Sequence, residues 1–313
     1  LSESDAALTP LARLDAAGNL VIFRAAPNAD GTYTFSDGVT ITFTEGIYDV
    51  KNGDVYYYLL SNTENPSQAT FNWPWFDEYS LVKTVSMEGG LKPASTSGMF
   101  KSANLTSAEL SMLDTSVVTD MSSMFSTGST SFNGSLTTLI GEENWDTSNV
   151  TNFASMFMMQ DGITSIDVGG WDMSSGSNFQ YMFRGCKALT QLDVSNWRMN
   201  TSATNGTFYY IFADCQKLTS IDVSGWTVDG IANMSYMFYN CYALTGPIDT
   251  SSWNTANVTN YRSMFQNCRA MGKIDASGLS LAKVTSTSGI SSMFATGSSA
   301  ADHELILGSG FEI

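Results

Sequence analysis

A repeating unit of about 25 residues runs through most of the chain, and it constrains the fold more than any other feature. Its clearest copy, residues 218–241, reads LTSIDVSGWTVDGIANMSYMFYNC. A Met-Phe pair, or once an Ile-Phe pair, marks each copy, and successive pairs lie 25 to 32 residues apart. The pairs begin at Met99, Met124, Met156, Met182, Ile211, Met237, Met264 and Met293. Repeats of this length that each have an apolar face must stack in order to bury it.

The apolar residues change their spacing inside the unit. Leu218, Ile221 and Val223 precede Trp226 in the L-x-x-L-x-L pattern of a short strand that ends in a turn. From Ile231 to Cys241 the apolar residues then recur every three or four positions, which predicts one face of a short helix. We therefore expect an α/β solenoid over residues 91–313. It would be a leucine-rich-repeat-like stack of short parallel strands and short helices, in about eight repeats with a C-terminal cap.

Residues 1–90 differ from the repeats and predict a small all-β N-terminal domain that anchors, caps or assembles the chain. Four segments are rich in β-branched and aromatic residues, and Asp-Gly and Asn-Gly pairs mark turns between them. These segments are residues 20–23, 33–35, 39–44 and 55–60. We place the domain boundary at Gly89-Gly90.

An aromatic cluster follows these strands. It consists of Phe71, Trp73, Trp75, Phe76 and Tyr79. It could form an exposed binding patch, but we favour a buried cover against the first repeats, because Trp usually buries most of its area.

Trp and Cys each recur at one position of the repeat. Trp stands at the turn in five repeats and Leu replaces it at both ends, which favours core packing over an exposed stacking surface for sugars. The cysteines are Cys186, Cys215, Cys241 and Cys268. We favour a column of buried thiols, with disulfides between neighbouring repeats as the alternative. We expect no metal site here, since the chain has no C-x-x-C motif and one histidine, His303.

Carboxylates occupy the exposed position at the centre of the predicted strand. Stacked strands would place them ~5 Å apart, where repulsion between neighbours must be offset. Hydrogen bonds from the next turn would do this, and so would bound Ca²⁺ or another ligand. The candidate binding residues on this face are Asp167, Asp193, Ser195, Asp222, Ser224, Asp249 and Asp275. We predict no catalytic residue and no required cofactor, with Ca²⁺ left open.

The composition narrows the class of partner. The net charge is −16, from 14 basic and 30 acidic residues, which disfavours nucleic acid and anionic membranes. No apolar run is long enough to cross a membrane, so we expect no direct membrane insertion. Charged residues make up only 14% of the chain, and Ser, Thr, Asn and Gly supply its polar surface, as is common in extracellular and virion proteins. The chain begins with Leu1, as expected of a processed form or a fragment.

The repeat resembles that of BspA-like surface proteins and of mycoplasma-type surface lipoproteins. The residues that carry the resemblance are L-T-x-L-D-V-S-x-W, D-T-S-N-V-T-N-x-x-x-M-F and the Cys that follows, over about residues 99–300. This resemblance implies a leucine-rich-repeat type of fold, a cell-surface or extracellular location, and adhesion to host proteins or to other cells.

We accordingly expect a non-enzymatic extracellular recognition or adhesion module. Its partner would be a surface protein or glycan of a host or neighbouring cell, bound through the solenoid face. The first alternative is a structural or receptor-binding protein of a virion or surface layer, which self-assembles through its N-terminal domain. The second, a glycan-active parallel β-helix enzyme, is less favoured, because such an enzyme needs two carboxylates in distinct environments and the repeat makes these carboxylates nearly equivalent.

Overall fold

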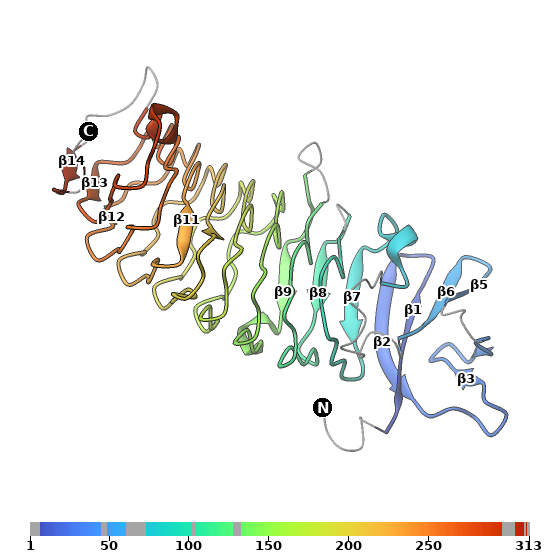
Figure 1. Ribbon diagram of the computed structural model, residues 1–313. Coiled ribbons are helices and arrows are strands. Elements are labelled where there is room, and N and C mark those ends of the chain that lie inside the picture. The colour runs from blue at the N-terminus through green and yellow to red at the C-terminus, as the bar shows by residue number, and fades with distance from the viewer. Residues whose placement is uncertain are drawn as a thin grey trace.

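The computed structural model describes residues 7–44, 49–60, 73–101, 104–127, 133–295, 304–309 and 311. Figure 1 shows an elongated stack of coils, with β1 to β6 at one end and β12 to β14 at the other. In the described residues the strands are β1 (Thr9–Leu14), β2 (Asn19–Ala25), β3 (Tyr33–Thr34), β4 (Thr40–Ile41), β5 (Asp49–Asn52), β6 (Val55–Leu59), β7 (Thr84–Met87), β8 (Ser107–Glu109), β9 (Thr138–Ile140), β10 (Gly206–Thr207), β11 (Ile231–Asn233), β12 (Ile248–Asp249), β13 (Lys273–Ala276) and β14 (Glu304–Leu307). Three short 3₁₀ helices accompany them: η1 (Phe76–Glu78), η2 (Glu142–Asn144) and η3 (Thr287–Ile290).

The largest sheet joins the N-terminal strands to the first repeats. Its strand order is β5-β6-β1-β2-β7-β8-β9. The pairs β5-β6, β6-β1 and β1-β2 are antiparallel, whereas β2-β7, β7-β8 and β8-β9 are parallel. The sheet therefore changes at β7 from the antiparallel pairing of the N-terminal strands to the parallel pairing of successive repeats. The division of the chain at residue 90 stays a prediction, and the hydrogen-bonded sheet itself runs across that point.

The expected α/β leucine-rich-repeat-like solenoid is wrong as a fold class. The described residues contain no α-helix, and the repeats are built from short strands, single bridges and turns. The segment from Ile231 to Cys241, which the spacing assigned to a helix, begins with strand β11 and continues as consecutive turns.

Backbone hydrogen bonds explain why this segment is not helical. Alternate N–H groups donate to the next coil: those of Met234, Tyr236 and Phe238 donate to the carbonyls of Asn260, Arg262 and Met264. Other N–H groups, such as that of Tyr239, donate to the carbonyl three residues back and close four-residue turns instead. An α-helix would need all these donors for its own i→i−4 bonds, so lateral pairing and a helix exclude each other.

Left-handed residues bend the chain in every copy of this segment. The residue before each Met-Phe or Ile-Phe pair has a φ between 54° and 62°. These residues are Gly98, Ser123, Ser155, Tyr181, Tyr210, Tyr236, Ser263 and Ser292. Positive φ interrupts a right-handed helix, and it lets the Met and Phe that follow both turn inward. Both side chains are buried in seven copies, and Phe294 of the last copy is partly buried against the core.

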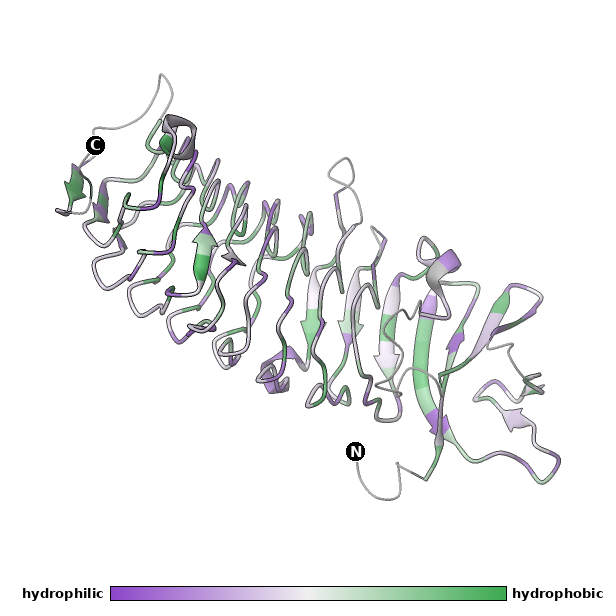
Figure 2. Ribbon diagram, in the orientation of Figure 1, coloured by the Kyte–Doolittle hydropathy of each residue, from purple (hydrophilic) through white to green (hydrophobic). Residues whose placement is uncertain are grey.

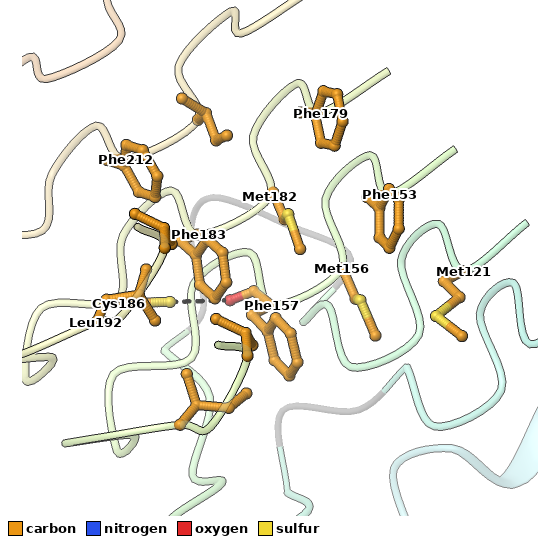
Figure 3. Close-up of a cluster of buried hydrophobic side chains, with 14 of the residues drawn as sticks. Met121, Phe153, Met156, Phe157, Phe179, Met182, Phe183, Cys186, Leu192 and Phe212 are labelled. Carbon is orange, nitrogen blue, oxygen red and sulfur yellow. Dashed lines mark hydrogen bonds between the residues drawn. The ribbon is translucent and has the colours of Figure 1, made fainter. Parts of the chain in front are cut away.

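Aromatic side chains form continuous columns in the core. Phe rings at the second position of the pair stack from Phe100 to Phe294, with centroids of neighbouring coils 5.3 to 5.9 Å apart. Figure 3 shows Phe157, Phe183 and Phe212 of this column beside the Met residues. Figure 2 shows hydrophobic and hydrophilic segments alternating in short pieces along the coils, as stacked short elements require.

The predicted core roles of Trp and Cys are confirmed. The five repeat tryptophans are at most 5% exposed, and Leu113 and Leu279 are buried at the same turn position. All four cysteines are free and buried. Each thiol donates to the carbonyl of a Phe in the preceding coil, as Cys186 does to Phe157 over 3.2 Å (Figure 3).

The aromatic cluster after the N-terminal strands also belongs to the core where it is described. Trp73 and Trp75 are almost fully buried, and their indole N–H groups donate to the carbonyls of Ser97 and Met99. Phe71 and the side chain of Phe76 lie outside the described part.

The left-handed position predicts how substitutions at Ser123 behave. Ser123→Val should lower the free energy of unfolding by about 2 kcal/mol, because a β-branched residue is strained at positive φ. Ser123→Gly should change it by less than about 0.5 kcal/mol, since Gly98 already occupies the equivalent place. Urea unfolding followed by circular dichroism measures both. Equal stability of the two variants would contradict the assignment.

Because the thiols are buried, we expect them to react with a thiol reagent only after the chain is unfolded. Burial raises the pKa of all four cysteines, that of Cys268 to about 12, so almost no thiolate is present near neutral pH. Ellman's reagent should label essentially none of the four thiols in the folded chain and all four in guanidinium. Fewer than four labelled thiols after unfolding without reductant would indicate disulfides.

Candidate functional site

A groove of about 1020 Å³ follows the exposed face of the strands. It crosses five successive coils, through residues 137–142, 165–167, 191–193, 220–224 and 246–249. Five acidic side chains line it: Glu142, Asp167, Asp193, Asp222 and Asp249. Among the described residues, no basic side chain is part of this lining. The groove is therefore a negatively charged trough that runs along the stack.

The strand register brings the predicted carboxylates into one column. Asp249 of β12 lies opposite Asp275 of β13, whereas Ile140 of β9, which lies opposite Glu109 of β8, interrupts the column. A parallel bridge between Gln191 and Ser220 sets the coils of Asp193 and Asp222 in the same register. Alignment of the repeats predicts the same arrangement from the sequence.

Each aspartate in the groove is held by a turn in its own coil. Oδ1 of Asp193 accepts hydrogen bonds from the N–H and the hydroxyl of Ser195, at 3.1 and 2.8 Å. Oδ1 of Asp222 is bound in the same way by Ser224, and Oδ1 of Asp249 accepts from the N–H of Ser251. These are Asx turns, in which a side chain fixes the backbone two residues ahead. They leave the Oδ2 atoms of these three aspartates without a hydrogen-bond donor among the described residues.

Hydrogen bonds of this kind lower the pKa of two aspartates of the column, Asp193 and Asp275. Those from the side chain and N–H of Ser195 lower the pKa of Asp193, and those of Ser277 lower the pKa of Asp275. Both carboxyls therefore carry full charge near neutral pH.

Most of the predicted site residues lie in the groove. Asp167, Asp193, Asp222, Ser224 and Asp249 line it. Two others do not. Ser195 serves the groove by orienting Asp193, and Asp275 lies one coil beyond it on β13. Their role in binding stays a prediction.

Glu142 is the residue that sequence reasoning missed. It begins η2, is 6% exposed, and its Oε2 atom has no hydrogen-bond partner in the described structure. Its carbonyl accepts from the indole of Trp171, just as Val168 and Val194 accept from Trp197 and Trp226. A carboxylate thus occupies a place that the neighbouring coils give to valine.

Tight packing holds η2 in position. Gly141 precedes it with a φ of 100°, and a side chain there would lie 2.5 Å from the backbone of Ser111. Glu142 is consequently fixed at one end of the groove. Burial raises the pKa of its carboxyl, and the nearby charges of Glu143 and Asp167 add to the shift.

A second surface feature, here called the tyrosine patch, lies on the Met-Phe segments. Tyr181, Tyr209, Tyr210, Tyr236 and Tyr239 are half-buried and contact one another, and the rings of Tyr210 and Tyr236 stack at 4.3 Å. The guanidinium of Arg184 lies 4.7 Å from the centre of the Tyr210 ring. A signal was present in the sequence, because Tyr replaces Ser before the Met-Phe or Ile-Phe pair in three successive repeats.

The described residues contain no group of three or more His, Cys, Asp or Glu side chains suited to hold a metal ion. Nor do they include a helix with the length and apolar character needed to span a bilayer.

Comparison with known proteins gives one family match. The family described as "Mycoplasma protein of unknown function, DUF285" matches residues 94–210 and 206–304, which cover the repeats. No curated protein and no solved structure matches the chain.

The buried carboxyl of Glu142 predicts that Glu142→Gln raises the melting temperature by an amount that depends on pH. Because the folded-state pKa lies above the unfolded one, the ionised form is disfavoured in the folded chain. This penalty is absent below the unfolded pKa and complete above the folded pKa. Glu142→Gln should therefore raise the melting temperature at about pH 7, and the gain should vanish at about pH 4.

Glu143→Gln is the matched control, since Glu143 is the exposed neighbour. Glu143 raises the pKa of Glu142 only as one of the lesser causes, so the gain in melting temperature of this variant at about pH 7 should be clearly smaller than that of Glu142→Gln. A gain for Glu142→Gln that did not change with pH would mean that the effect is not one of charge.

Proposed function

The chain belongs to the family described as "Mycoplasma protein of unknown function, DUF285", and we propose that it is a non-enzymatic recognition or adhesion module that acts outside the cell. Its partner is a protein or glycan on the surface of a host or neighbouring cell. The resemblance of the repeats to BspA-like and mycoplasma-type surface proteins supports the location and the adhesive role.

The single observation that carries the proposal is the groove. It continues across five coils, and the turns that hold Asp193, Asp222 and Asp249 leave one carboxylate oxygen of each for a partner. Such an extended surface suits a long ligand more than a small substrate. The carboxylates in the turns are also nearly equivalent, whereas acid-base catalysis uses groups whose environments separate their roles.

Binding to cells tests the proposal. The fluorescently labelled chain should bind to animal or bacterial cells in a saturable way, as measured by flow cytometry. Asp193→Asn/Asp222→Asn should weaken this binding by about tenfold or more, which corresponds to about 1.4 kcal/mol. Asn keeps a side-chain oxygen for the Asx turn, so the variant removes charge without removing the turn.

The control is Asp146→Asn/Asp172→Asn. These two aspartates make the same kind of turn at another corner of the coil, and Asn254 makes it in a later repeat. This control changes the net charge equally and should bind like the parent chain. Absence of saturable binding to every cell type would overturn the proposal, as would release of reducing ends from glycans. A stable trimer in sedimentation would favour the structural alternative.

A further inference from the structure

We propose that the groove binds an extended basic segment of a partner protein, whose cationic side chains contact the aspartate column and Glu142. This inference rests on the proposed recognition function and specifies the chemistry of the partner. Four features of the groove lead to it: its length, its charge, the Oδ2 atoms of its aspartates and the buried Oε2 atom of Glu142.

The dimensions of the groove suit an extended peptide. Its lining comes from five coils. Neighbouring coils joined by parallel bridges lie about 4.8 Å apart, so the groove is about 19 Å long. An extended chain advances about 3.3 Å per residue, and about six residues would fill this length. Successive side chains of such a segment alternate between the groove and solvent.

The charge of the lining selects the kind of peptide. Of the residues that the structure describes, five acidic ones and no basic one line the groove. Carboxylates about 5 Å apart repel one another by about 0.8 kcal/mol per pair even in water. A Lys or Arg side chain placed between two of them would relieve this repulsion. A neutral glycan would leave it in place, and an anionic ligand would increase it.

The turns prepare the aspartates for such contacts. Asp167, Asp193 and Asp222 are exposed, and in each of them Oδ1 is bound by the N–H two residues ahead. Their Oδ2 atoms accept no hydrogen bond from any residue that the structure describes. An arriving ammonium or guanidinium group therefore meets oriented acceptors, and little side-chain freedom is lost on binding.

Glu142 provides an independent indication of a cationic ligand. Its Oε2 atom is buried and has no hydrogen-bond partner among the described residues, although buried polar atoms are normally hydrogen-bonded. Glu142 lines one end of the same groove. A guanidinium group that reached it would supply the missing donor and satisfy the charge at once.

A short synthetic peptide tests the inference directly. The probe is fluorescein-labelled (Arg-Ser)₃, which presents a guanidinium at every second residue. Fluorescence anisotropy with the full chain should show saturable binding at low ionic strength. The same peptide with citrulline for arginine keeps the shape and loses the charge, so it should bind at least about tenfold more weakly.

Variants distinguish binding in the groove from non-specific attraction to the net negative charge of the chain. Asp193→Asn/Asp222→Asn should weaken binding of the arginine peptide by about tenfold, and Glu142→Gln should weaken it by about threefold. Asp146→Asn/Asp172→Asn should weaken it by less than about twofold, because its carboxylates are not part of the groove. Circular dichroism confirms that each variant is folded.

Three results would overturn the inference. They are equal losses in the groove and control variants, equal binding of the citrulline peptide, and binding of a neutral glycan that the arginine peptide does not displace. The cell-binding experiment tests the proposed recognition function independently of the basic-peptide inference. If cells are bound through the groove but the arginine peptide is not, the recognition function stands and the basic partner does not.

Discussion

Lateral hydrogen bonding between neighbouring coils is the interaction on which the rest of the structure depends. N–H groups of the Met-Phe segment donate to carbonyls of the next coil, and bridges on the strand side do the same. Once these bonds form, like residues of successive repeats must lie above one another. The columns of Phe, Trp, Cys and Asp follow from this register. The core and the groove are thus two results of a single pairing rule.

The register of the repeats could be predicted from the sequence, but the backbone conformation of the Met-Phe segment could not. Apolar residues three and four apart fit a helix, and they fit equally a series of turns with left-handed residues between them. Glycine would have indicated such turns, yet only Gly98 holds the left-handed position, while Ser or Tyr holds it elsewhere. Lateral bonds between coils decide between the two conformations, and no single repeat contains that information.

The candidate site was predictable where it is periodic and hidden where it is not. Asp193 and Asp222 repeat in register, so the alignment of the copies places them on one exposed face. Glu142 lies in a locally irregular repeat, and its meaning depends on the neighbours that bury it. The tyrosine patch joins side chains of three coils, and its ring contacts appear only when the coils are stacked.

Because every coil binds its neighbours by the same bonds, the reach of the groove is set by the number of copies. Gain or loss of one whole repeat by duplication or deletion would change its length by about 4.8 Å and leave the remaining coils as they are. In proteins built from such repeats, the length of the groove can therefore change in steps of one coil. Within each copy, the aspartates of this face, such as Asp193 and Asp222, are hydrogen-bonded to turns of their own coil, so each of them can vary independently of the neighbouring copies.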